Sequence, residues 1–272
     1  MLARYHLEDE LGTGARGAVY RGRDKTTGCK VALKLLTDDS PRELRCGGDA
    51  VARHTDAARR LRLDHPDIAR VLGTARAGLL RYVAMELAEG ADLSGHARPG
   101  NLLPLSLVLS IVARAAAALE YAHAEGFVHG DVKPSNIVYD ENTDRVKLVD
   151  FAPYDDDLSR TTLAYLAPEV LCGAGRSAAS DQFALGATLY QLACGRLPFV
   201  ARSQPELAWR IVHEAPADVR DAAPEVPAAL SAILGRALAK DPARRYPTLD
   251  SFARSVSRLR ACLTPAPAAS AG

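Results

Sequence analysis

The densest group of polar side chains in this sequence lies in one short segment, His129-Gly130-Asp131-Val132-Lys133-Pro134-Ser135-Asn136. Asp131 is a candidate general base, because a carboxylate beside a hydroxyl group can accept or orient its proton. Lys133 could stabilise negative charge on a transferring phosphate, and Asn136 offers a neutral oxygen to a metal ion. The structural alternative is an Asx turn after a helix. The complete pattern favours the chemical interpretation.

A second candidate group is rich in glycine. Residues 12–17 have the sequence Gly-Thr-Gly-Ala-Arg-Gly, and Val19 completes the spacing G-x-G-x-x-G-x-V. Glycine backbones can approach phosphate oxygens closely and present N–H groups to them. A dinucleotide-binding fold would place a helix next, but residues 18–21 have the character of a strand. The segment therefore favours a glycine hairpin over a nucleotide, and a tight hairpin without a ligand stays open as the alternative.

Two charged residues stand at the ends of apolar strands. Lys34 ends the run Val31-Ala32-Leu33-Lys34, where its ammonium group could lie beside the α- and β-phosphates of a nucleotide. Taken alone, Lys34 is better explained as a surface lysine at a strand edge. Asp150 follows the apolar run 146–149 and precedes Phe151. A carboxylate at such a strand end suits Mg²⁺, which prefers one or two carboxylates together with phosphate oxygens.

The composition limits the class of protein. Of the 272 residues, 48% are apolar, which is typical of a globular protein. The net charge is +1 and the arginines are scattered, so the sequence has no basic tract that would bind nucleic acid. Five widely spaced cysteines without a C-x-x-C pair argue against a disulfide framework or a zinc site. No signal peptide is visible, and Pro104 and Arg114 interrupt the longest apolar stretch, 102–119. We expect a soluble, cytoplasmic protein that binds neither nucleic acid nor membranes.

The elements that must position these side chains divide the chain into two parts. Before residue 88, short apolar runs between glycines and turn residues predict strands at 5–12, 18–23, 30–35, 69–74 and 80–87, with a helix over 49–63. After Gly90 the apolar spacing predicts helices at 108–122, 181–193, 206–213, 227–239 and 249–262, and strands at 136–139 and 145–149. We expect an α+β fold with a β-rich N-lobe (1–88), a mainly helical C-lobe (89–262), a ligand cleft between them and a disordered tail (263–272).

The candidate motifs follow one another in an order that resembles the eukaryotic-type (Hanks-type) protein kinase family, in its bacterial serine/threonine branch. These motifs are the glycine-rich segment 12–17, the run that ends at Lys34, the segment 129–136, Asp150-Phe151 and Ala167-Pro168-Glu169. The resemblance runs from about Tyr5 to Leu259. It implies a bilobal kinase-like catalytic domain over residues 1–262, ATP with Mg²⁺ or Mn²⁺ as cofactors, and a protein substrate. Lys133 and the placement of Thr162 before Tyr165 resemble the serine/threonine class and not the tyrosine class.

The resemblance also implies a role for each candidate residue. Asp131, Lys133 and Lys34 would be catalytic, whereas Asn136 and Asp150 would hold the metal ions. Met85 would lie behind the adenine, and the backbone of residues 86–88 would form the hinge. The ATP-binding residues would be Leu11, Gly12, Thr13, Gly14, Ala15, Gly17, Val19, Ala32, Lys34, Met85, Glu86 and Ala88. The structural supports would be Asp56, Thr162, Asp181 and the pair Glu169–Arg245.

Four features depart from the family pattern. Gly130 replaces the arginine that usually contacts a phosphate on the activation loop, so we expect activity without loop phosphorylation; drift in a degraded enzyme is the alternative. Ala152 stands where the family has a glycine after the Asp-Phe pair.

Two further departures concern the partner of Lys34 and the segment after Asp150. The helix that should supply a glutamate to Lys34 offers only Asp56, with Asp49 and Glu43 as weaker candidates. The segment between Asp150 and Glu169 is short, and its serine and threonine hydroxyls, the candidate autophosphorylation sites, are Ser159, Thr161 and Thr162.

Two other functions stay open. Ala152 and the missing glutamate favour a pseudokinase scaffold, but the intact Lys34, Asp131, Asn136 and Asp150 oppose it. A small-molecule phosphotransferase of the aminoglycoside or choline type would share the His-Gly-Asp segment and the following asparagine. Such enzymes lack a segment like Ala167–Glu169 and usually the lysine after the aspartate. We therefore expect an active kinase that acts on proteins.

Overall fold

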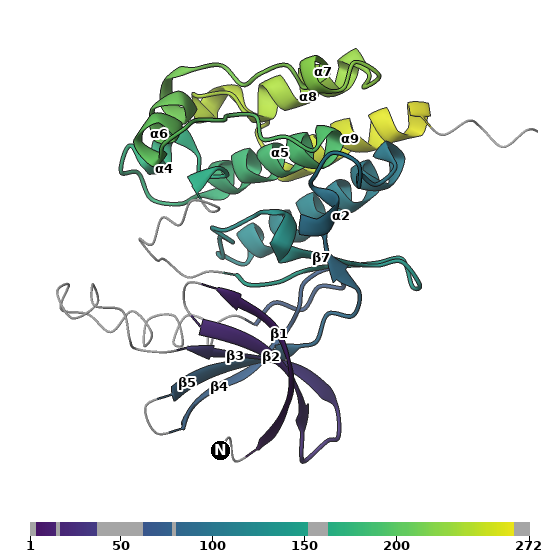
Figure 1. The fold of residues 1–272 in the computed structure, drawn as a ribbon, viewed down its shortest axis with the longest axis vertical. Helices are drawn as coiled ribbons and strands as arrows, with labels where there is room; N and C mark the ends of the chain where they lie inside the picture. Colours follow the sequence, from purple (N-terminus) through teal and green to yellow (C-terminus); the bar gives the residue numbers. More distant parts are fainter. Residues whose placement is uncertain (1–3, 15–16, 37–61, 78–79, 152–162, 264–272) are drawn as a thin grey trace, which may run out of the picture.

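The computed structural model describes residues 4–14, 17–36, 62–77, 80–151 and 163–263, and it places a β-sheet at one end of the molecule and a group of helices at the other (Figure 1). The strands of the larger sheet come first in the sequence, and the long helices follow them. The change of apolar spacing after Gly90 marks this transition in the sequence. The expected α+β arrangement of a β-rich part followed by a mainly helical part is therefore confirmed.

A five-stranded antiparallel sheet forms the first part, in the order β1-β2-β3-β5-β4. Its strands are β1 (Tyr5–Gly14), β2 (Gly17–Asp24), β3 (Lys30–Leu36), β4 (Val71–Ala77) and β5 (Leu80–Glu86). The central strand β3 is covered on both faces. Val31 and Leu33 pack into an apolar cluster with Tyr5, whereas the alternate residues Ala32 and Lys34 face the other side of the sheet.

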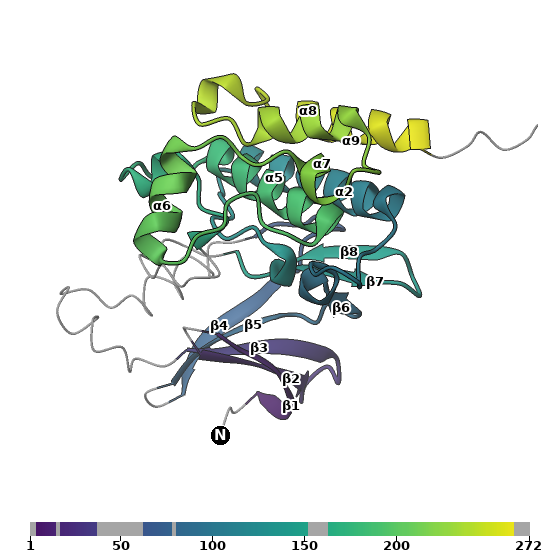
Figure 2. The ribbon, with the colours of Figure 1, turned by 45° about the horizontal axis from the view of Figure 1, so that its top comes forward.

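Three long helices form the centre of the second part. Helix α2 (Leu105–Ala124) packs against both α5 (Ala178–Cys194) and α9 (Leu249–Leu263), as Figures 1 and 2 show. Helix α5 is buried along most of its length. Among the described residues, α2 is the one helix long and apolar enough to cross a membrane, but its apolar face, which includes Ile111 and Leu119, lies in the core. Packing inside the protein therefore explains its apolar character.

Shorter elements complete the described chain. A three-stranded sheet of β6 (Ala91–Asp92), β7 (Ile137–Asp140) and β8 (Arg145–Leu148) lies between the larger sheet and the helices (Figure 2). The remaining helices are α4 (Pro168–Leu171), α6 (Gln204–His213), α7 (Val219–Ala222) and α8 (Ala228–Ala237). Single 3-10 turns occur at η2 (Leu93–His96), η3 (Pro134–Asn136) and η4 (Pro242–Arg244).

The start of β4 differs from the expected one for a physical reason. The sequence predicts a strand from Ala69, but β4 begins at Val71. The backbone just before it bonds to β8 instead, since Ala69 N–H donates to Leu148 O (2.9 Å) and Leu148 N–H donates to Asp67 O (2.8 Å). The segment 67–69 therefore belongs to the contact between the two sheets.

The helix ends also need correction. Helix α5 begins at Ala178, ahead of the expected start at Asp181, and α8 ends at Ala237 rather than at residue 239. Leu263, expected in the tail, is the last residue of α9, and residues 264–272 lie outside the described chain. Most of the helix expected over 49–63 also lies outside it, and residues 62–63 are not helical.

Candidate active site

A cleft of about 910 Å³ lies between the five-stranded sheet and the smaller sheet. Residues from both parts of the molecule line it. Of the predicted ATP-binding residues, those in its wall are Leu11, Gly12, Thr13, Gly17, Val19, Ala32, Lys34, Met85, Glu86 and Ala88. The opposite wall contains the other predicted catalytic and metal-binding residues, which are Asp131, Lys133, Asn136 and Asp150.

The glycine segment forms the hairpin between β1 and β2, where Gly14 pairs with Gly17. Gly17 has a φ of +131°, and a Cβ atom there would lie 1.8 Å from the carbonyl oxygen of Leu35 on β3. Only glycine fits this close approach of two strands. Gly14 belongs to the hairpin but is not among the described residues that line the cleft, and Ala15 lies outside the described chain.

Lys34 and Asp150 meet across the cleft. The ammonium group of Lys34, which is almost fully buried, forms an ion pair with Oδ1 of Asp150 just beyond the end of β8. Asp150 has a φ of +60°, a left-handed conformation that aspartate tolerates better than most residues with a Cβ atom.

The 129–136 loop brings further polar side chains into the cleft, among them Asp131, Lys133 and Asn136. Lys133 Nζ lies 2.7 Å from Oδ2 of Asp131. Asn136 Nδ2 donates to the carbonyl oxygen of Asp131 at 2.7 Å and to its Oδ2 at 3.2 Å. The Asn136 amide is thereby oriented by Asp131, which leaves its oxygen atom as the group that could bind a metal.

Asp181, on the buried helix α5, stabilises the backbone of this loop. Its carboxylate accepts hydrogen bonds from the backbone N–H groups of His129 and Gly130, each at 2.8 Å, and lies 2.8 Å from Nε2 of His123. Three donors therefore converge on one carboxylate that is 1% exposed. This arrangement fixes the backbone that carries Asp131.

His129 connects the loop to the end of β8. Burial lowers the pKa of His129 and outweighs the opposing effect of the nearby Asp181 and Asp131 carboxylates. The neutral ring has one donor and one acceptor nitrogen. Nδ1 accepts from the N–H of Asp131 (3.2 Å), so Nε2 carries the proton and donates to the carbonyl oxygen of Val149 (3.1 Å). His129 therefore fixes the backbone of Asp131 relative to that of Val149, which precedes Asp150.

Gly130 occupies a position with a φ of +77°. Residues with a Cβ atom rarely adopt this left-handed conformation, whereas glycine adopts it without steric cost. The glycine that replaces the family's arginine is therefore compatible with the geometry of the loop. Its N–H group still reaches Asp181, so the support beneath Asp131 does not depend on an arginine side chain.

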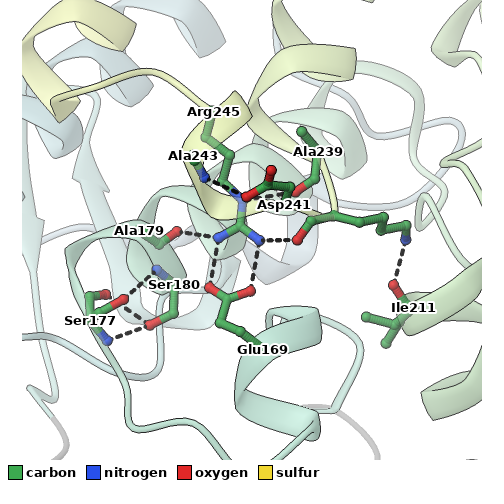
Figure 3. Close-up of polar contacts among 10 residues, drawn as sticks. Glu169, Ser177, Ala179, Ser180, Ile211, Ala239, Asp241, Ala243 and Arg245 are labelled. Carbon is green, nitrogen blue, oxygen red and sulfur yellow. Dashed lines mark hydrogen bonds and ion pairs between the residues drawn. The ribbon is translucent and has the colours of Figure 1, made fainter.

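The predicted pair Glu169–Arg245 is present in the helical part (Figure 3). The Arg245 guanidinium is fully buried and binds both Glu169 carboxylate oxygens at 2.7 Å. It also donates to the carbonyl oxygens of Ala179 (2.8 Å) and Ala239 (2.9 Å). One side chain thus joins α4, the first turn of α5 and the segment after α8.

Several expected residues lie outside the described chain, and several unexpected ones line the cleft. Ala152, Ser159, Thr161, Thr162 and the candidate partners of Lys34, namely Asp56, Asp49 and Glu43, are outside it. The cleft also contains Leu87, which belongs to the expected hinge, together with residues that were not expected there: Ala69, Gly90, Ala91, Asp92, Ser94, Gly95, Ser135, Val138 and Val149. The strand predicted at 136–139 could have indicated Val138, whereas nothing in the spacing indicates Asp92.

The donor set in the cleft suits a hard divalent cation. The described residues include no group of three or more His, Cys, Asp or Glu side chains that could hold a metal. A metal here would rely on Asp150, Asn136 and the oxygen atoms of a phosphate ligand. Mg²⁺ and Mn²⁺ accept such oxygen ligands, whereas a structural zinc site needs four protein ligands.

Comparison with known proteins places this geometry in a family. A model of the protein kinase domain matches residues 5–255. The serine/threonine-protein kinase PknJ of Mycobacterium tuberculosis is 33% identical over 94% of this chain and 45% of its own length. The DNA damage-responsive serine/threonine-protein kinase RqkA of Deinococcus radiodurans is 35% identical over 90% of this chain and 38% of its own length. The chain thus spans less than half the length of these relatives.

Solved structures show the same similarity. The crystal structure of a variant of the Mycobacterium tuberculosis PknI kinase domain matches with a TM-score of 0.74 and 31% identity, over 95% of this chain and 96% of that one. Rad53 in complex with AMP-PNP matches with a TM-score of 0.77 and 25% identity, over 93% of this chain and 64% of that one.

Proposed function

This chain belongs to the protein kinase family, and we propose that it is an active serine/threonine kinase that transfers the γ-phosphate of ATP to hydroxyl groups of proteins. The observation that carries the proposal is the convergence of three distant segments on one cleft. Lys34 comes from β3, Asp150 follows β8, and the 129–136 loop supplies Asp131. Phosphoryl transfer requires positioning and charge neutralisation of this kind more than covalent chemistry.

Each side chain would act as follows. Lys34 would bind the α- and β-phosphates, and Asp131 would accept or orient the proton of the substrate hydroxyl. Lys133, now 2.7 Å from Asp131, is close enough to balance charge on the transferring group. Asn136 and Asp150 would hold Mg²⁺ or Mn²⁺, which would neutralise charge on the phosphates. Leu11, Ala32 and Met85 would enclose the adenine, and Gly14 and Ala15 would cover the phosphates with the rest of the hairpin.

A protein substrate is better supported than a small molecule. Small-molecule phosphotransferases lack the segment around Glu169, whereas here Arg245 binds it with both terminal nitrogens. The relatives named above are serine/threonine-protein kinases. Activity is better supported than a pseudokinase scaffold, because Lys34, Asp131, Asn136 and Asp150 all line one cleft.

The remaining parts of the proposal concern the chain as a whole. We assign the N-lobe to residues 1–88, the C-lobe to residues 89–262 and a tail to the residues that follow α9. Autophosphorylation would use Ser159, Thr161 or Thr162. Gly130 in place of an arginine supports activity that does not wait for this modification. A cytoplasmic location without nucleic-acid or membrane partners agrees with the net charge of +1.

The test is phosphate transfer with matched variants. Purified protein is incubated with ATP, Mg²⁺ or Mn²⁺ and a generic basic protein, and phosphoserine and phosphothreonine are measured. We expect Lys34→Ala and Asp131→Ala to lower the rate by on the order of 100-fold or more, because each removes charge placement or proton transfer. Lys30→Ala is the control, since Lys30 lies on the same strand as Lys34 but forms an exposed ion pair with Glu89.

The outcomes separate the three functions. Transfer that is lost in both variants and kept in Lys30→Ala supports the proposed kinase. Thermal stabilisation by nucleotide without transfer to any protein indicates a pseudokinase. Transfer to aminoglycosides or choline in place of protein would overturn the assignment of the substrate.

A further inference from the structure

A second group of charges lies at the hinge, away from the reacting groups. The Glu86 side chain extends from the end of β5 to Lys147 on β8, where Oε1 lies 2.9 Å from Nζ. Its other oxygen accepts from the N–H of Arg70 (3.3 Å) and lies 3.5 Å from the Arg70 side chain. Lys147 also donates to the carbonyl oxygen of Ile68 at 3.2 Å. One lysine on β8 thus binds both the segment before β4 and the end of β5.

This ion pair is shielded from water. The side chains of Lys147 and Glu86 are 15% and 27% exposed, whereas those of the nearby pair Lys30–Glu89 are 51% and 56% exposed. Exposed pairs contribute little because water and salt screen them. Burial raises the pKa of Glu86, but its hydrogen bonds from Lys147 and Arg70 outweigh this effect and lower the pKa overall. The charged form of Glu86 is therefore favoured by its partners.

Two ion pairs connect the larger sheet to β8 and its C-terminal end. Lys34 on β3 reaches Asp150, and Glu86 on β5 reaches Lys147. The strands β3 and β5 are paired directly, with Val31 opposite Glu86, and Asp150 follows Lys147 by three residues. Phosphates and a metal would compete for both members of the first pair. The second pair takes no part in such chemistry and can persist throughout a reaction cycle.

We propose that Lys147 is a positioning residue that, through Glu86, holds the hinge in the geometry that retains the nucleotide. The inference rests on the proposed function, because it concerns the same cleft. The chain passes from β5 of the larger sheet to β6 at residues 86–90, and the Lys147–Glu86 pair ties the start of this segment to β8. Loss of the pair would loosen the hinge and allow faster release of ADP.

The test measures nucleotide binding separately from phosphate transfer. The ADP dissociation constant and dissociation rate are determined for the full chain and for Lys147→Met, Glu86→Gln and the double variant. We expect both single variants to raise the ADP dissociation rate by roughly 5-fold, since a shielded ion pair contributes more than an exposed one. The effect of the double variant should be smaller than the sum of the two single effects, because both single variants remove the same ion pair, while Arg70 and Ile68 are separate partners. Lys30→Met, which removes the exposed pair, should leave the rate unchanged.

Two further measurements exclude a purely structural effect. In steady-state kinetics, Lys147→Met should raise KM for ATP without lowering kcat, and amide hydrogen exchange should increase over residues 86–92. If Lys147→Met does not fold, Glu86→Gln decides alone, because it keeps the shape of the side chain and removes its charge.

The result that overturns the inference is an unchanged ADP dissociation rate in Lys147→Met or Glu86→Gln, or an equal change in Lys30→Met. Fully additive effects in the double variant would also overturn it. Unmodified protein that binds no ADP would refute the proposed function itself, together with this inference. Normal ADP binding with unaffected variants would refute the inference alone.

Discussion

A buried carboxylate fixes the backbone that leads to Asp131. Asp181 accepts hydrogen bonds from the N–H groups of His129 and Gly130 and contacts the ring of His123, so the backbone at residues 129–130 is tied to α5. These three donors would be without acceptors if the carboxylate were removed. Unsatisfied polar groups in a protein interior are costly, which makes Asp181 more sensitive to substitution than the cleft residues themselves.

We predict that Asp181→Asn lowers the free energy of unfolding by about 2–3 kcal/mol, because its amide nitrogen would face an N–H donor in place of an acceptor. Urea unfolding measures this change, provided that the slope of the unfolding free energy against urea concentration is the same for both proteins. The matched control is Asp250→Asn, whose carboxylate pairs with Arg254 on the surface of α9. We expect that control to change stability by less than about 0.5 kcal/mol. Equal losses in both variants would contradict the role assigned to Asp181.

A second prediction concerns acid stability. The hydrogen bond from Arg4 and the N–H of Thr26 lower the pKa of Asp24 from 3.8 to about 2. The unfolded chain therefore binds more protons than the folded chain between these values, and the stabilising effect is lost as the pH falls from about 4 to about 2. Asp24→Asn should flatten this part of the stability curve, measured as Tm against pH. Exposed Asp9→Asn should leave its slope unchanged.

Single residues were predictable where short local spacing defines them. Asp131, Lys133 and Asn136 lie within one loop, and the structure brings them to the same cleft as Asp150. Lys147 could not be found in this way. Its importance comes from Glu86, a residue on a strand far away in the sequence, and an isolated lysine in the strand 145–149 carries no signal of that contact.

At the scale of elements, the start of α5 depends on capping rather than on apolar spacing. Ser177 accepts a hydrogen bond from the N–H of Ser180 (3.3 Å), and Ser180 accepts one from the N–H of Ser177 (2.8 Å). This reciprocal arrangement satisfies two groups at the start of the helix. Because α5 carries Asp181 in its first turn, the cap also fixes the position of that carboxylate.

We predict that Ser177→Ala lowers the free energy of unfolding by about 1 kcal/mol, the usual contribution of an N-cap side chain. Differential scanning calorimetry gives the accompanying decrease in Tm. Ser177→Asp, which also supplies a cap acceptor, should recover most of the stability. A variant Ser177→Ala as stable as the unmodified chain would show that tertiary packing alone sets the start of α5.

Helix interiors and strands were predictable because their apolar residues repeat with a period set by local geometry. The exact ends were not, since they depend on partners outside the element. The strand expected from Ala69 begins at Val71 because Ala69 bonds to Leu148 on another sheet. The helix expected from Asp181 begins at Ala178 because of the serine cap.

At the scale of the whole molecule, two of the polar centres in the described chain are ones that the order of the sequence motifs predicts. The first is the cleft, where Lys34 meets Asp150. The second is the Arg245 cluster, which joins α4, α5 and the segment after α8 in the helical part (Figure 3). The order of the sequence blocks predicted both centres, because each block matches a known family pattern. None of the Arg245 contacts lines the cleft, so the two centres should be separable by experiment.

We predict that Arg245→Lys lowers the free energy of unfolding by about 3–5 kcal/mol, because a lysine cannot reproduce the two-pronged contact and leaves buried acceptors around Glu169 unsatisfied. The folded fraction should still bind ADP with an unchanged dissociation constant, since the nucleotide cleft is untouched. Calorimetric titration at a temperature where the variant is folded measures the binding, and urea unfolding measures the stability. Arg254→Lys, at an exposed pair with Asp250, serves as the control and should be nearly neutral. Loss of ADP binding in a folded Arg245→Lys protein would mean that the helical part and the cleft are coupled, contrary to the separation of their contacts.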